Sequence, residues 1–284
     1  MTPNGNAAQP SGSSKKRPSN FWLIIVAALF IIVPFLTWYL TWFGRALSDE
    51  KIAEYLIDEK HPRNTQHALA QIEARMEKGD GSVKKFYPRI VELAKSLNVE
   101  VRKTVAWVMG QDNSSEDFHR ALLELLKDSE PLVRRNAALQ LVRFGDANGR
   151  PELRAMLQSF EVKAPFSGTL VSLLTVGSNV RAGSLLARIR DASGTVQEFR
   201  APVDGTIAAP VAKEAEPVTA NQTIAWLRPE RTSIDAALDA LAYVGAKDDL
   251  PTIESCAQVD GSRETTAQAA LTAKAIRQRL TPAP

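Results

Sequence analysis

A β-type segment interrupts an otherwise helical chain, and this segment repeats itself. Its first half covers 162–190 and its second half covers 199–228. The halves match at three places: Ala164-Pro165 with Ala201-Pro202, Gly168-Thr169 with Gly205-Thr206, and Val180 with Val218. Short strands between turn signals are typical of small β folds. The duplication therefore predicts a small sandwich of two intertwined halves.

The flanking sequence is helical in pattern on both sides of this segment. Apolar residues recur at helical spacing, and Asn64, Asn98 and Ser115 are suited to cap helix starts. Gly79, Gly110, Gly145 and Gly245 are suited to helix ends. The predicted helices cover 49–60, 64–78, 84–96, 99–110, 116–127, 131–144, 150–158, 232–244, 249–257 and 263–280.

Two of these helices share a sequence pattern, in which 101–107 aligns with 133–139, and this pattern resembles HEAT repeats. It reads Val133, Arg134, Ala137, Ala138, Leu141 and Gly145, and more weakly Ala237, Leu238, Leu241 and Gly245. The resemblance implies HEAT-like helix pairs over 46–160 and 231–280, stacked into a curved α-solenoid whose concave face binds protein partners. A generic helical bundle is the alternative.

Four basic residues on two of the predicted helices are candidates for partner binding. Arg102, Lys103, Arg134 and Arg135 could form a basic ladder for an acidic protein. The alternative is that they are solvated or support the turns between helices, which is the more common role of surface charge.

The β segment, 161–230, falls between helices 150–158 and 232–244, which read as partners in one repeat. Its doubled Ala-Pro and Gly-Thr stretches resemble biotinyl/lipoyl-like domains and the barrel-sandwich part of membrane fusion proteins. Gly168 and Gly205 are expected at tight turns with positive φ. Val180-Arg181-Ala182-Gly183 and Val218-Thr219-Ala220-Asn221 are expected to share a left-handed turn. The predicted core is Leu185, Leu186, Ile189, Ile224, Trp226 and Leu227.

This resemblance comes with two departures. Carrier domains bear a modified lysine between the halves, but residues 191–195 contain none, and Lys163 and Lys213 lie elsewhere. Fusion proteins place a long helical hairpin at this point, where this chain has a short connection. We therefore expect an interaction module without a cofactor.

The N-terminal region predicts a membrane anchor. Residues 1–20 are predicted to be a disordered cytoplasmic tail, and 21–43 contain no charge and have aromatic residues near both ends. The expectation is a transmembrane signal-anchor helix in the inner membrane that contacts lipid, with Lys15, Lys16 and Arg17 on the cytoplasmic side and the later domains in the periplasm.

Neither composition nor motifs predict catalysis. A net charge of +3 does not suggest nucleic acid as a partner, and one cysteine, Cys256, provides no metal cluster and reads as a small buried residue. His61, His67 and His119 lack metal-ligand or nucleophile motifs.

The predicted fold class is mainly α with a transmembrane helix and an inserted all-β domain. The predicted function is a membrane-anchored, non-enzymatic scaffold for protein partners in a membrane complex. The alternatives are an adaptor of an envelope secretion or efflux system and a biotinyl/lipoyl-type carrier.

Overall fold

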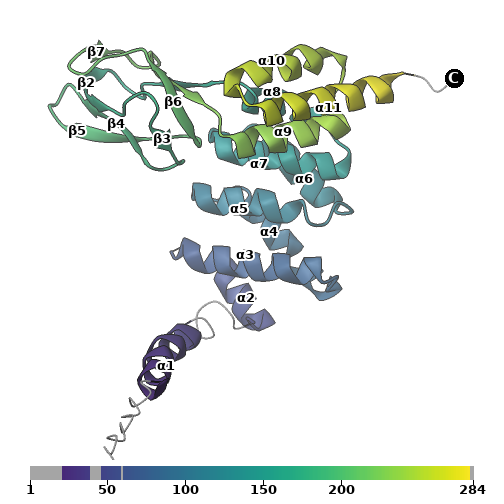
Figure 1. Cartoon of the computed structure of the whole chain (residues 1–284). Coiled ribbons are helices and arrows are strands. Elements are labelled where there is room, and N and C mark those ends of the chain that lie inside the picture. The colour runs from purple at the N-terminus through teal and green to yellow at the C-terminus, as the bar shows by residue number, and fades with distance from the viewer. Residues whose placement is uncertain (1–20, 39–45, 59, 282–284) are drawn as a thin grey trace, which may run out of the picture. The chain divides into compact units, whose positions relative to one another are not determined.

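The structure is a computed structural model that describes residues 21–38, 46–58 and 60–281. The chain divides into two compact units, Met1–Leu47 and Ser48–Pro284 (Figure 1). The predicted disordered tail, 1–20, lies outside the described residues.

The first unit contains one described helix, α1 (Phe21–Trp38), which has 18 residues. At about 1.5 Å per residue this helix is about 27 Å long, against about 30 Å for a hydrocarbon core. In the part of the chain that the structure describes, no helix has both the length and the apolar character that a bilayer crossing requires. This finding contradicts the predicted membrane span over 21–43, of which 39–43 lie outside the described residues, and with it the predicted lipid contact, orientation and location.

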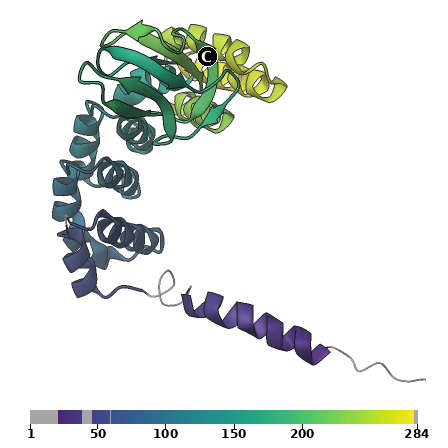
Figure 2. The same cartoon turned by 90° about the vertical axis from the view of Figure 1, so that its left-hand side faces the viewer.

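The second unit is built from helix pairs that stack on one another (Figure 1). Each pair has a first and a second helix, and contacts run within pairs and between the second helices of successive pairs. Figure 2 shows the same stack from the side of the strands. The pairs are α2 (Asp49–Leu56) with α3 (Pro62–Glu77), α4 (Tyr87–Leu93) with α5 (Val99–Met109), α6 (Glu116–Leu125) with α7 (Pro131–Leu141), α8 (Arg150–Met156) with α9 (Arg231–Val244), and α10 (Leu250–Asp260) with α11 (Arg263–Leu280).

Local chemistry explains most of the helix starts. The Asn98 side chain accepts a hydrogen bond from the Val101 N–H, and Ser115 accepts one from the Phe118 N–H. The predicted cap at Asn64 is wrong. The helix begins earlier, because Pro62 occupies its first turn, and the Asn64 amide donates to Asp58 instead, at 2.7 Å.

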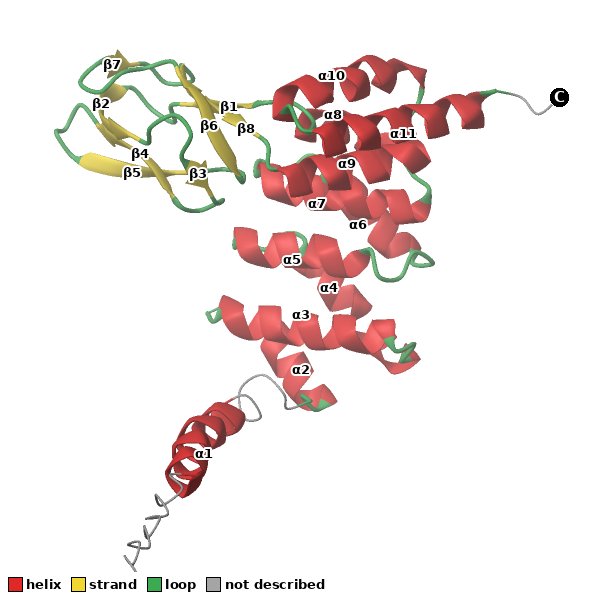
Figure 3. Cartoon of the chain, viewed as in Figure 1, coloured by secondary structure: helices red, strands yellow, loops and turns green. Residues whose placement is uncertain are grey.

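Between α8 and α9 the chain forms two four-stranded antiparallel sheets (Figure 3). The strand order is β1-β8-β6-β3 in one sheet and β5-β4-β2-β7 in the other. Replacing each strand by its counterpart in the other half converts the first order into the second, so each sheet contains strands from both halves. The strands are β1 (Phe160–Lys163), β2 (Gly168–Leu173), β3 (Asn179–Val180), β4 (Leu185–Arg190), β5 (Val196–Arg200), β6 (Gly205–Pro210), β7 (Pro217–Val218) and β8 (Thr223–Arg228).

The predicted glycine roles in this sandwich need correction. Gly168 and Gly205 do not have positive φ. Gly183 and Asn221 do, in the matched turns where the sequence pattern placed a left-handed residue, and so do Gly177, Gly194 and Ala215. A Cβ at Gly205 would lie 2.6 Å from the carbonyl oxygen of Arg228, and one at Gly168 would be closer still to the carbonyl oxygen of Arg190. Both glycines are therefore required by the close approach of two strands.

The sandwich core also departs from the prediction at two side chains, Leu185 and Trp226. Leu186, Ile189, Ile224 and Leu227 are buried in one cluster. Trp226 is 36% exposed, because it alternates with the inward-facing Leu227 along β8. The predicted core is therefore correct for these four aliphatic residues, whereas Leu185 is only half-buried and Trp226 is partly exposed.

The two helices on either side of the sandwich pack against each other. Leu153 and Leu157 from the α8 side share a buried cluster with Ile234 and Leu238 of α9. The α8–α9 pair is thus one repeat whose connecting loop contains the sandwich. Cys256, on α10, is buried in the same cluster, as predicted.

Candidate protein-interaction site

The structure gives the predicted basic residues partners within the chain. Arg102 forms a two-point ion pair with Asp128, which lies after the next repeat's first helix, at 2.6 and 2.9 Å. Lys103 pairs with Glu100 one turn earlier on the same helix. Because Arg102 also donates to the Ser96 carbonyl, this side chain ties two successive connecting turns together.

Arg134 and Arg135 converge on one carboxylate of the following helix. Arg134 lies 3.0 Å from Glu152, and Arg135 lies 3.7 Å from the same side chain. Arg135 is buried and lies over the Phe160 ring at the start of the sandwich. These contacts favour support of the turns over the alternative of an exposed ladder for an acidic partner.

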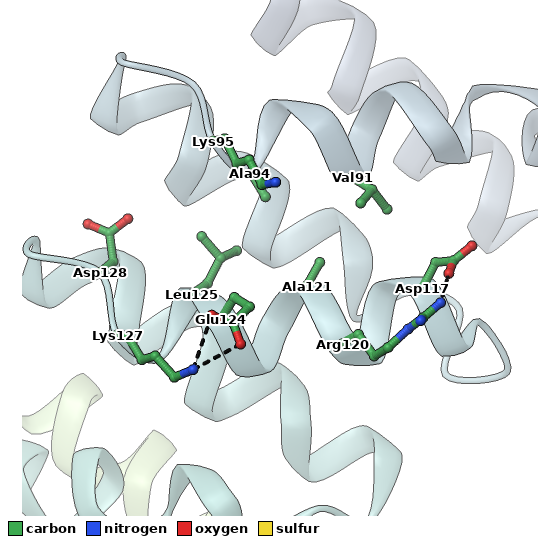
Figure 4. Close-up of a pocket in the computed structure, with 10 residues that line it drawn as sticks. All are labelled: Val91, Ala94, Lys95, Asp117, Arg120, Ala121, Glu124, Leu125, Lys127 and Asp128. Carbon is green, nitrogen blue, oxygen red and sulfur yellow. Dashed lines mark hydrogen bonds and ion pairs between the residues drawn. The ribbon is translucent and has the colours of Figure 1, made fainter.

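An open groove lies between the first helices of two successive repeats, α4 and α6 (Figure 4). It has a volume of about 680 Å³. Its apolar surface comes from Val91 and Ala94 on one wall and from Ala121 and Leu125 on the other. Small side chains at Ala94 and Ala121 leave the space between the two helices unfilled.

The charged residues of this groove are arranged differently at its two ends. Asp117 and Arg120 pair with each other at one end (Figure 4). At the other end are Lys95, Lys127 and Asp128. The Asp128 carboxylate is already occupied by Arg102, and this pairing together with backbone hydrogen bonding outweighs the effect of burial and lowers the pKa of Asp128.

A second groove lies one repeat earlier, between α2 and the α4 region. Its volume is about 500 Å³, and its apolar lining includes Leu56, Ile57 and Phe86. Open, partly apolar grooves thus occur at two successive positions in the layer of first helices.

The sequence analysis did not find these grooves. The available signal was the alanine spacing on the first helices, where Ala94 follows Val91 by three residues and Leu125 follows Ala121 by four. Such a pattern also fits a buried helix face, so the sequence alone does not distinguish an open groove from a filled one.

Two of the three histidines, His61 and His119, contact carboxylates. His61 contacts Asp58 at 3.0 Å, and His119 contacts Asp146 at 2.6 Å while stacking on Phe144. Across the described ranges, no group of three or more histidine, cysteine and acidic side chains is placed to hold a metal ion.

Comparison with known proteins supports the helical repeats. Residues 87–164 match the family model of HEAT repeats, so the predicted HEAT-like repeats are confirmed over this range. None of the curated proteins matches the chain significantly. One similar solved structure is described as a single-chain, multi-domain long-chain acyl-CoA carboxylase, at 20% identity over 46% of this chain, with a TM-score of 0.23. This chain spans only 14% of that protein, and so low a TM-score carries no inference about fold or activity. What the comparisons establish is that this chain contains HEAT-like repeats.

Proposed function

We propose that this protein is a non-enzymatic scaffold that holds protein partners on its helical repeats and on its sandwich. The observation that carries the proposal is the HEAT-like array, with open grooves between successive first helices. Helical repeat arrays present extended surfaces of this kind to other proteins. The sandwich adds a second surface at the edge of the array from which the α8–α9 loop leaves.

We further propose that the sandwich is a biotinyl/lipoyl-like module used for contact and not for carrying a group. Two observations support this: the interleaved order of the strands, and the short turn between the halves. In that turn the Asp191 carboxylate accepts hydrogen bonds from the Ser193 and Thr195 N–H groups at 2.9 and 3.1 Å. The aspartate thus closes the turn where a carrier would present its lysine.

The scaffold proposal is tested by photo-cross-linking in cells of the source organism. A benzophenone amino acid would replace Arg120 in the α4–α6 groove, Tyr243 on α9 and Arg188 on the sandwich, one at a time; all three side chains are exposed. We expect discrete adducts with other proteins from one or more positions. Lys78, exposed in the turn after α3 and outside the sandwich and both grooves, is the control position, from which we expect no adduct. If no position produced a protein adduct, the scaffold function would be wrong.

The missing lysine leads to a prediction about covalent modification. The exposed lysines of the sandwich are Lys163 and Lys213, and neither lies in the turn between the halves. We expect the intact mass of native protein to equal that of the unmodified chain, apart from ordinary N-terminal processing. A biotinyl or lipoyl mass increment located on either lysine would restore the carrier function.

A further inference from the structure

We propose that the groove between α4 and α6 docks an amphipathic helix of a partner protein that carries acidic residues on its docking face. The inference rests on the proposed scaffold function and specifies one of its surfaces. It follows from the shape of the groove, its apolar lining and the unequal charge at its two ends.

The shape fits the side chains of a helix. The lining combines two alanines with Val91 and Leu125, so the opening is apolar at its floor and bounded by two helices. A third helix packs onto such a pair by placing its own ridge of side chains in the groove, at about 8–10 Å between axes. Aliphatic side chains one turn apart on the partner would cover the floor.

The charges select an acidic partner. At the end that holds Lys95 and Lys127, the only carboxylate lining the groove besides Glu124 is Asp128, and Arg102 neutralises it. Lys127, in the turn after α6, pairs with Glu124 at the end of that helix, and both side chains are more than 70% exposed, so this pair contributes little. Within the described residues Lys95 has no ion-pair partner. This end of the groove is therefore positive, while the Asp117–Arg120 end is balanced.

The test uses the full chain and a defined peptide. The probe is a fluorescein-labelled, alanine-rich helical peptide with two leucines one turn apart and two glutamates on the same face. Its matched peptides carry lysine in place of glutamate, or serine in place of leucine. We expect the first peptide to bind at least tenfold more tightly than either matched peptide, by fluorescence anisotropy, and its affinity to fall with added salt.

Variants of the protein locate the binding. The double variant Lys95→Glu with Lys127→Glu should lower the affinity for the glutamate peptide by at least tenfold. It should raise the affinity for the lysine peptide. The control pair is Lys213→Glu with Lys247→Glu, which makes the same charge change at exposed positions outside the groove and should leave both affinities unchanged. Ala94→Phe should fill the groove and also weaken binding, with its melting temperature showing that it folds.

Three outcomes would overturn the proposal: no binding of the glutamate peptide, equal binding of the glutamate and lysine peptides, or equal loss of affinity in the groove and control variants. The results distinguish an error in the proposed docking groove from an error in the proposed scaffold function. Photo-adducts at Tyr243 or Arg188, with none at Arg120 and no peptide binding, would leave the scaffold standing and reject the groove. The absence of adducts at every position would reject the scaffold itself.

Discussion

Replacing Gly168 by alanine should destabilise the sandwich by about 2–3 kcal/mol, because the added methyl group would run into the backbone of β4. The obstacle is a carbonyl oxygen of a central strand, which cannot rotate away as a flexible side chain could. The same change at Gly205 should act similarly against β8. The loss of sandwich stability is measured by hydrogen exchange, as faster exchange of the backbone amides in 160–228 relative to those of α2–α7.

The matched control for this prediction is Gly81→Ala. Gly81 has an ordinary φ, and a Cβ there would meet nothing within 4 Å. It should leave the exchange of the sandwich unchanged. If Gly168→Ala exchanged like the parent protein, the close approach of β2 and β4 would not be the reason for glycine at this position.

Replacing Asp249 by alanine should lower the free energy of unfolding of the helical array by about 2–3 kcal/mol. This carboxylate is fully buried and accepts hydrogen bonds from Arg150 at 2.7 Å, Arg154 at 2.6 Å and the Ala246 N–H at 2.7 Å. Removing it leaves two arginines of α8 without their buried partner. The expected cost is below the roughly 3–5 kcal/mol of a fully buried pair, because both arginines are partly exposed. Urea denaturation of the full chain measures it.

Asp248→Ala provides the control, since Asp248 contacts the same two arginines but is 68% exposed. It should cost less than about 1 kcal/mol. Equal losses from the two variants would show that burial of Asp249 is unimportant.

The stability of the parent protein and that of Asp249→Ala should also depend differently on pH. Burial raises the pKa of Asp249, but hydrogen bonds from Arg150, the Ala246 N–H and Arg154 outweigh it and hold the pKa below its ordinary value. The stabilisation is therefore present above the unfolded-state pKa of about 3.9 and is lost as the pH falls through the lower folded-state value. The difference in stability between parent and Asp249→Ala should narrow below about pH 4.

Periodicity was sufficient to predict the helices of the second unit. The array needs one apolar face per helix, and residues such as Val133, Ala137 and Leu141 show that face directly in the sequence. The duplication of the β segment was likewise sufficient to predict a sandwich of two intertwined halves. Matched turns such as those at Gly183 and Asn221 have the same left-handed backbone.

The failures involve contacts between residues far apart in the chain. Nothing near Arg102 indicates that Asp128 will bind it, and nothing near Gly168 indicates that the backbone of Arg190 lies against it. The open groove is a third case, because it depends on how far apart α4 and α6 lie. The predicted membrane span is wrong for another reason: among the described residues no helix has both the length and the apolar character of a bilayer crossing.

The position of the sandwich has a consequence for synthesis on the ribosome. α9 begins at Arg231, about 75 residues after α8 ends at Met156. At roughly 5–20 residues per second, α8 waits roughly 4–15 seconds for the helix that covers its apolar side. Leu153, Met156 and Leu157 lack their α9 partners during that interval, while the repeats before them can already be complete. Because the sandwich also needs both of its halves, it closes only as the chain approaches α9. The fourth repeat and the sandwich therefore finish folding almost together, and nascent chains should show a window of chaperone binding that starts at α8 and ends when α9 emerges.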